Sequence, residues 1–219
     1  MGIGKGIRVL GLLLLGGGLG PLQAVYQIDY ILNLGSLSIG QIRLVHYSNH
    51  VTARVRITAS GLIDFQQEDR CSWQTGMDSL RDDIRTSSGN KLSYENIVFL
   101  SNVVGYVRYS GFQTNRQDYT NRNKSNSLLA FVHSFIAKVL PDKPSHTLFL
   151  NGKFSDITLC PLGTNQLMVM DRNEKYEIGV TFRKQDAFYI PERVDLKKYM
   201  MYGINWNMFN CTLKDFKIK

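Results

Sequence analysis

Apolar and polar residues alternate along much of the chain after residue 24. In the segment "VTARVRIT", Val51, Ala53, Val55 and Ile57 fall on one face of an extended chain, and threonines and arginines fall on the other. A period of two with one polar face is typical of antiparallel strands that cover a core on one side. Similar patterns predict further strands at about 39–47, 67–76, 92–100, 103–112, 146–151, 155–160, 165–170, 175–183, 186–190, 192–198 and 205–217.

The segment "VYQIDY" is expected to be the first strand of the folded protein. Tyr26, Ile28 and Tyr30 alternate with Gln27 and Asp29, so the three apolar side chains share one face. We expect that face to be the buried one.

One segment, 125–140, has the period of a helix instead. Its apolar residues form a stripe at helical spacing, namely Leu128, Val132, Phe135, Ile136 and Val139. Ser125 or Asn126 can cap its start, because their side-chain oxygens can accept backbone N–H groups. Pro141 and Pro144 are expected to end it.

Two polar segments are predicted to be exposed loops. Residues 113–127 contain few apolar residues. In "DSLRDDIR", Asp78, Asp82 and Asp83 are interleaved with arginines, which indicates a solvated loop whose charges neutralise one another. Paired carboxylates that act as acid and base would have to face each other across a cleft.

Many antiparallel strands with a single amphipathic helix predict a mostly antiparallel β fold: a curved sheet, half-barrel or barrel with the helix of residues 125–140 packed on or in it. Residues 25–219 are long enough for one domain, and no linker divides them. Such a sheet can leave an apolar cavity for a ligand beside the helix.

The N-terminal segment has the pattern of a secretory signal peptide. Lys5 and Arg8 precede the apolar run Val9–Leu15, and Ala24 is a suitable last residue before cleavage. The glycines that follow the run, with Pro21, argue against a permanent membrane span, although an uncleaved N-terminal anchor stays as the alternative. We therefore expect residues 1–24 to be removed and the protein to be exported.

The net charge of +8 suits anionic surroundings such as a lipid headgroup layer or an acidic glycan. A basic surface without a partner is the simpler interpretation, and an exported protein is not expected to bind nucleic acid. Cys71, Cys160 and Cys211 allow at most one internal disulfide, and their spacing does not select a pair or suggest zinc. They are interpreted as small buried apolar residues.

The order of these elements resembles a family of exported bacterial proteins, the domain of unknown function 3108. The resemblance rests on "VYQIDYILNLGSLSIGQIRL" after the signal peptide, on the single helix "SLLAFVHSFIAKVL", and on "FYIPERVDL" followed by "NWNMFNCTLKDF". It covers most of residues 25–217, and Gly35, Gly40 and Pro191 are interpreted as turn residues. The resemblance implies a mostly β protein of the cell envelope, similar in fold to lipoprotein carriers or lipocalins, and it implies no catalytic residue.

No catalytic, metal or cofactor site is predicted. His46 and His50 flank a hairpin turn, so their spacing does not indicate a metal site. His133 is interpreted as an interior histidine of the helix, and Cys71 has no histidine near it in sequence. No serine has the sequence context of a nucleophile elbow.

The aromatic residues give the candidate ligand site: Tyr106, Tyr109, Phe112, Phe131 and Phe135, which would line a lipid or glycan pocket if they are not simply core. The predicted function is therefore non-enzymatic binding of an apolar or amphipathic, lipid-like ligand in a sheet–helix cavity of an exported protein. The alternatives are a structural or interaction protein of the envelope with a filled core and, third, a hydrolase, which would need a nucleophile–base pair inside a cleft.

Overall fold

A computed structural model describes the fold of residues 24–59, 63–74, 79–121, 125–136, 145–150, 152–171, 176–185, 188–201, 204–205 and 209–218. The predicted signal peptide up to residue 23, together with Asp78, Pro141 and Pro144, lies outside these residues. Within them, no helix has both the length and the apolar content that crossing a bilayer would need.

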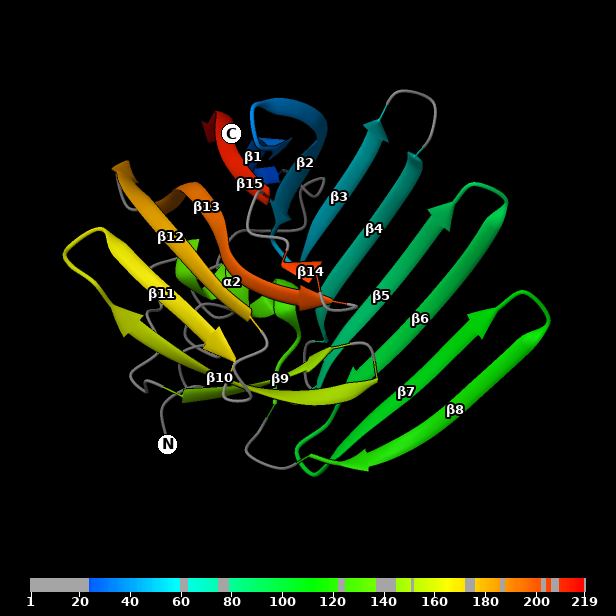
Figure 1. Ribbon diagram of the computed structural model, residues 1–219. Helices are drawn as coiled ribbons and strands as arrows, with labels where there is room; N and C mark the ends of the chain where they lie inside the picture. Colours follow the sequence, from blue (N-terminus) through cyan, green and yellow to red (C-terminus); the bar gives the residue numbers. More distant parts are fainter. Residues whose placement is uncertain are drawn as a thin grey trace.

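The described residues form one antiparallel sheet of 15 strands that curves strongly (Figure 1). The strands are β1 (Ala24–Leu34), β2 (Leu37–Tyr47), β3 (His50–Ala59), β4 (Ile63–Gln74), β5 (Ser79–Ser88), β6 (Lys91–Phe99), β7 (Val103–Ser110), β8 (Gln113–Thr120), β9 (Ser145–Leu150), β10 (Lys153–Pro161), β11 (Gln166–Asp171), β12 (Tyr176–Gln185), β13 (Phe188–Met201), β14 (Ile204–Asn205) and β15 (Phe209–Ile218). Their order in the sheet is β8-β7-β6-β5-β4-β3-β2-β1-β15-β13-β12-β11-β10-β9, and β14 pairs with β13.

Strand β1 lies near the middle of this order, between β2 and β15. Tyr26, Ile28 and Tyr30 are all buried in the main hydrophobic cluster, as the alternation in the sequence predicted. The strand is held by ladder hydrogen bonds on both sides, so its apolar face can be fixed against the core.

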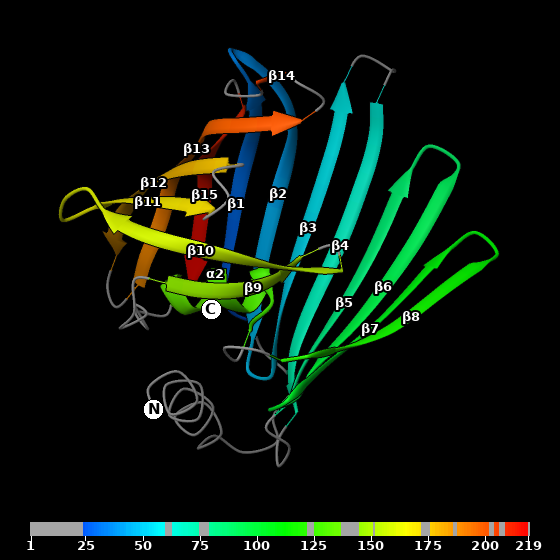
Figure 2. The same cartoon turned by 60° about the horizontal axis from the view of Figure 1, so that its bottom comes forward.

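The sheet does not close into a barrel through main-chain hydrogen bonds. In Figure 2 strands β9 and β10 cross in front of β1 to β3, and the strand order ends at β8 and β9. Aromatic side chains join these two ends, because the ring centroid of Phe149 on β9 lies 5.1 Å from that of Tyr119 on β8. Tyr106 and Phe154 also contact Phe149, with ring centroids at 5.7 and 5.1 Å. The predicted fold class, a curved antiparallel sheet with one helix, is confirmed.

Two predicted loops are strands. Segment 79–88 forms β5, and segment 113–120 forms β8, the edge strand beside β7. β5 is paired along its length with β4 and β6, so neighbouring strands satisfy the backbone of a sequence that lacks a strong β pattern. In addition, two separate strands were predicted at 186–190 and 192–198, but their described residues, 188–190 and 192–198, belong to the continuous strand β13.

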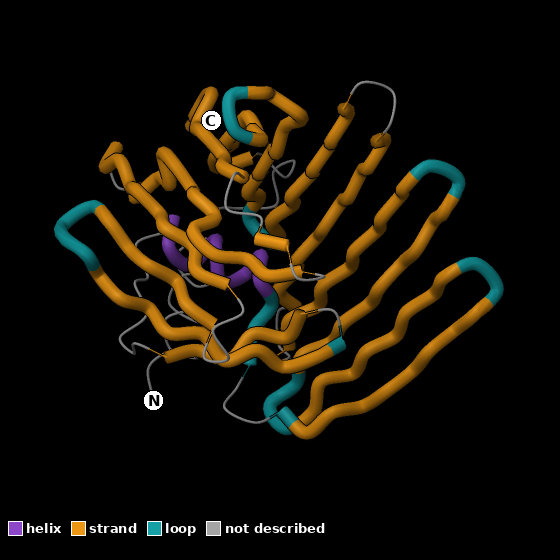
Figure 3. The backbone as a smooth tube through the Cα atoms, in the orientation of Figure 1, coloured by secondary structure: helices purple, strands orange, loops and turns teal. Residues whose placement is uncertain are grey.

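Helix α2 (Leu128–Ile136) lies within the curve of the sheet and contacts β3, β4, β9 and β13 (Figure 3). Because strands surround it on more than one side, its buried surface is wider than a single stripe. Leu129 and Ala130 pack in the main cluster, and Phe131 packs in a second cluster with Leu148 and Ile157. Leu128, which the predicted stripe included, is instead 48% exposed.

The cap of α2 also differs from the prediction. The Ser127 hydroxyl oxygen accepts the N–H of Ala130 at 3.0 Å, which makes Ser127 the N-cap. The backbone of Asn126 is engaged elsewhere, because its N–H donates to Thr147 O and its carbonyl accepts the N–H of Phe149. This segment therefore pairs with the free edge of β9 before the helix begins.

Candidate functional site

The structure separates the aromatic residues that the sequence suggested as a ligand site. Tyr106 is buried in the main cluster, and Phe131 is buried in the second cluster. Tyr109 is 45% exposed on β7, and Phe112 is fully exposed in the turn between β7 and β8. The side chain of Phe135 lies outside the described part of the structure. The four described side chains do not line one pocket.

A stack of buried rings lies between β1, β2 and α2. The Tyr26 hydroxyl and Nδ1 of His133 are 2.7 Å apart, and the rings of His46 and His133 stack with centroids 4.3 Å apart. Burial lowers the pKa of His46 to about 4, and burial together with the charge of His46 lowers that of His133 to about 3. Within the described residues, His133 Nε2 and both ring nitrogens of His46 have no hydrogen-bond partner. His133 is thus interior as expected, but its second nitrogen is unsatisfied.

A pair of buried carboxyl groups lies under the start of α2. Asp69 on β4 and Asp82 on β5 both point into the curve of the sheet, and burial raises the pKa of each. Asp82 was predicted to lie in a solvated loop, and this was wrong: its side chain is 3% exposed. The N-cap Ser127 lies beside the pair and also donates to Cys71 Sγ at 3.4 Å.

These buried groups do not form an accessible catalytic site in the described structure. Burial raises the pKa of the Cys71 thiol well above its ordinary value, so the reactive thiolate is disfavoured. None of Cys71, Asp82, Ser127 and His133 lines either hollow that the structure describes. All three cysteines are free, and only Cys71 is fully buried, so the prediction of buried cysteines is confirmed for one of three.

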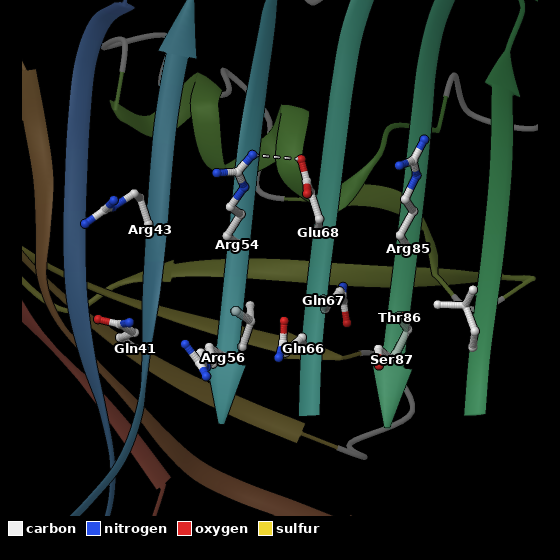
Figure 4. Close-up of a pocket in the computed structure, with 12 residues that line it drawn as sticks. Gln41, Arg43, Arg54, Arg56, Gln66, Gln67, Glu68, Arg85, Thr86 and Ser87 are labelled. Carbon is white, nitrogen blue, oxygen red and sulfur yellow. Dashed lines mark hydrogen bonds and ion pairs between the residues drawn. The ribbon is translucent and has the colours of Figure 1, made fainter. Parts of the chain in front are cut away.

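A hollow lies on the opposite, outer face of the sheet (Figure 4). It has a volume of about 340 Å³ and crosses strands β2 to β6. Its lining includes Arg43, Arg54, Arg56, Arg85 and one acidic residue, Glu68. We call this hollow the arginine groove. In Figure 4 helix α2 lies behind the strands, on the side away from these side chains.

Strand register creates the groove. Arg43 pairs across the sheet with Arg54, Arg54 pairs with Glu68, and Glu68 pairs with Arg85. Paired residues in antiparallel strands project from the same face, so one row of charged side chains runs across four strands. Arg56 lies in the neighbouring row, beside Gln41 and Gln66.

The positive charge of the groove is only partly neutralised. Arg43 Nε donates to Asp29 at 2.6 Å, and Arg54 donates to Glu68 at 3.3 Å. Among the described residues, neither Arg56 nor Arg85 has an ion pair with an acidic side chain. Arg43 and Arg54, directly opposite each other, repel because they carry like charges. The groove therefore presents guanidinium groups that no acidic side chain in the described part of the chain neutralises.

A second hollow of about 350 Å³ continues the arginine groove toward β1 and β15. The two hollows share Gln41 and Arg56, and the second adds Lys214 and the apolar side chain of Ile31. The sequence already placed Arg54 and Arg56 on the polar face of one strand. The row was missed because Arg85 was assigned to a loop.

No family model matches the chain, and no curated protein matches it. A solved structure with a similar fold is the beta-barrel-like protein of domain of unknown function DUF1849 from Brucella abortus, with a TM-score of 0.54. It covers 91% of this chain and 99% of its own length at 11% sequence identity, so the likeness concerns the fold alone. A second solved structure, of a DUF1329 family protein from Desulfovibrio piger ATCC 29098, covers 100% of this chain and 94% of its own chain at 11% identity. Its TM-score of 0.22 is too low to indicate a shared fold.

Proposed function

We propose that this chain is an exported, non-enzymatic protein of the bacterial cell envelope that binds an anionic amphiphile in the arginine groove. The single observation that carries the proposal is the set of four arginines that line a hollow of about 340 Å³, of which Arg56 and Arg85 have no ion pair among the described residues. Export is supported by the basic and apolar pattern of the N-terminal residues.

The residue types of the groove favour an acidic headgroup with an apolar chain. A guanidinium group can donate two parallel hydrogen bonds to a phosphate or carboxylate, which gives both strength and geometry. Leu92 lines the same groove and is 69% exposed. An amphiphile could cover Leu92 with its chain while its headgroup meets the arginines, and a simple inorganic anion would leave Leu92 in water.

The site proposed here replaces the sheet–helix cavity that the sequence suggested. Leu129, Ala130 and Phe131 of α2 are buried against strands, which favours a filled interior around the helix. The hydrolase alternative is less well supported, because Ser127 beside Asp82 and Tyr26 beside His133 are buried and line neither described hollow.

Calorimetric titration with dodecyl phosphate monomers tests the proposal. We expect saturable binding to the full chain, with much weaker heat for decyl maltoside, which has no charge, and for inorganic phosphate, which has no chain. Binding should weaken as salt rises from about 0.05 to 0.5 M, because exposed charges are screened.

A double variant, Arg56→Gln with Arg85→Gln, should weaken the binding of dodecyl phosphate by about tenfold or more, since each lost charge-assisted contact is worth about 1 kcal/mol or more. Arg183→Gln with Arg193→Gln is the matched control, because it removes the same charge from β12 and β13. Equal loss in both variants would show a general effect of net charge and would contradict a site in the groove.

A further inference from the structure

The outer face of the sheet carries a second surface beside the arginine groove. Leu92, Tyr109 and Phe112 are all exposed and lie toward the turns of the β5–β6 and β7–β8 hairpins. These two turns project side by side at the free margin of the sheet (Figures 1 and 2). We call these three residues the hairpin end.

The groove and the hairpin end belong to one continuous face. The row Arg54–Glu68–Arg85 continues through Tyr94 to Tyr109, because each residue pairs with the next across the sheet. The rings of Tyr94 and Tyr109 stack with centroids 5.8 Å apart. Leu92 pairs with Ser87 and also lines the groove, so it lies where the two surfaces meet.

We infer that the arginine groove and the hairpin end together dock this face onto a bilayer that contains anionic lipid. This inference rests on the proposed function and names the source of its ligand: the headgroups are those of lipids that stay in the membrane. The partner is thus a lipid surface, and the protein contacts it peripherally.

Charge and apolar exposure favour the bilayer for different reasons. Basic side chains near an anionic membrane surface each contribute about 1 kcal/mol, and aromatic side chains prefer the headgroup level. Phe112 is fully exposed at the tip of a turn, so it makes no packing contact that would hold it flat against the sheet. A protruding apolar ring suits a fluid interfacial layer, which yields to it, better than a rigid protein surface, which would need a matching pocket. An acidic glycan would leave Phe112 and Leu92 exposed.

Vesicle sedimentation of the full chain tests the inference. We expect binding to vesicles of phosphatidylcholine with about 30% phosphatidylglycerol to exceed binding to phosphatidylcholine alone by about tenfold, given the charge of the groove. Every variant carries the same N-terminal residues, so any contribution from them is common to all measurements. A wild-type protein that binds both vesicles equally would overturn the inference.

The double variant Tyr109→Ser with Phe112→Ser separates this inference from the proposed function. It should lose about tenfold in vesicle binding and retain the calorimetric binding of dodecyl phosphate, because neither residue lines the groove. Leu162→Ser is the matched control, since Leu162 is exposed in the β10–β11 turn, which lies on the opposite side of the molecule from the β5–β6 and β7–β8 turns (Figure 1).

The other outcomes are distinguishable. If Arg56→Gln with Arg85→Gln abolishes both kinds of binding and the hairpin-end variant changes neither, the groove binds anions but the docking surface is wrong. If the wild type binds neither dodecyl phosphate nor vesicles, both proposals fail. A third outcome is that the protein binds polyglutamate as tightly as anionic vesicles and that the hairpin-end variant does not change this binding. That result would assign the face to acidic proteins and overturn the inference.

Discussion

The Tyr26 hydroxyl lies 2.7 Å from Nδ1 of His133, and this buried hydrogen bond joins the first strand of the sheet to helix α2. His46 stacks on His133 from the neighbouring strand β2. The helix is therefore held inside the sheet partly by two histidines that must stay neutral, since a buried imidazolium without an acidic partner is disfavoured.

The first prediction is a loss of stability in mild acid. The pKa of His46 is about 4 in the folded protein and about 6.5 when unfolded. The contribution of neutral His46 to the free energy of unfolding is therefore present above about pH 6.5 and is lost as the pH falls toward 4. At pH 5 this loss amounts to about 2 kcal/mol. Urea denaturation at about pH 7.5 and pH 5 measures this loss.

The matched variant is His46→Phe, which keeps a ring against His133 but cannot take up a proton. It should lose less stability than the wild type between the two pH values. If the wild-type free energy of unfolding does not fall toward pH 5, or if His46→Phe falls as steeply, the histidines do not control the acid response.

The second prediction concerns neighbouring aspartates with opposite environments. Burial raises the pKa of Asp82, so its contribution to stability is present below about pH 3.8 and is lost as the pH rises. Partial burial also acts on Asp83, but hydrogen bonds from Tyr94, Asn96 and Arg81 outweigh it and lower its pKa. The contribution of Asp83 is therefore present above about pH 3.8 and is lost as the pH falls.

The substitutions to asparagine should consequently have opposite signs at neutral pH. Asp82→Asn removes a carboxyl group that is costly to ionise, so we expect a gain of about 1–2 kcal/mol at pH 7.5 that disappears in acid. Asp83→Asn should destabilise the protein at the same pH. Chemical denaturation of both variants measures the two signs, and a loss of stability in Asp82→Asn at neutral pH would contradict the interpretation that burial disfavours the charged form of Asp82.

Alternation along single strands was enough to predict much of the fold. It located most of the strands and identified the buried face of β1, because burial on one side of a sheet imposes a period of two on each strand separately. The helix was also predicted from periodicity, because its apolar residues recur at helical spacing and not at every second position. Its exact buried surface was not predicted, since that depends on how many strands surround it.

The arginine groove could not be predicted in the same way. Arg54 and Glu68 become neighbours through the pairing of β3 with β4, and local alternation does not specify the register of such a pair. Strand β5 added a further difficulty, because buried Asp82 interrupts its apolar face and made the segment look like a loop. Burial raises the pKa of this aspartate, so β5 holds a carboxyl group whose charged form is disfavoured.

The third prediction distinguishes the observed helix cap from the one expected. Ser127→Ala removes the acceptor for the N–H of Ala130 and should destabilise the protein by about 1 kcal/mol. Asn126→Ala is the control, because Asn126 is engaged through its main chain in the described structure. Thermal denaturation should show a clear decrease in Tm for the first variant only; equal decreases would mean that Ser127 is not the dominant cap.

The fourth prediction concerns Gly40, which the sequence suggested as a turn residue and which lies within β2 instead. A Cβ atom at Gly40 would clash with the backbone carbonyl oxygen of Arg56, which directly precedes Ile57, the partner of Gly40 in the β2–β3 pair. The clash is with backbone, so relief requires the two strands to separate, and we expect Gly40→Ala to cost about 2–3 kcal/mol.

Gly105→Ala is the matched control on β7, because its added Cβ would meet only the side chain of Asp118 at an ordinary 3.5 Å. Its stability should change by less than about 0.5 kcal/mol.

Gly40→Ala should also affect ligand binding, because Gly40 lines the second hollow and lies against the backbone of Arg56. We expect weaker binding of dodecyl phosphate under conditions where the variant is still folded. A Gly40→Ala protein as stable as the wild type, with unchanged binding, would contradict both the close approach of β2 and β3 and the placement of Arg56 beside it.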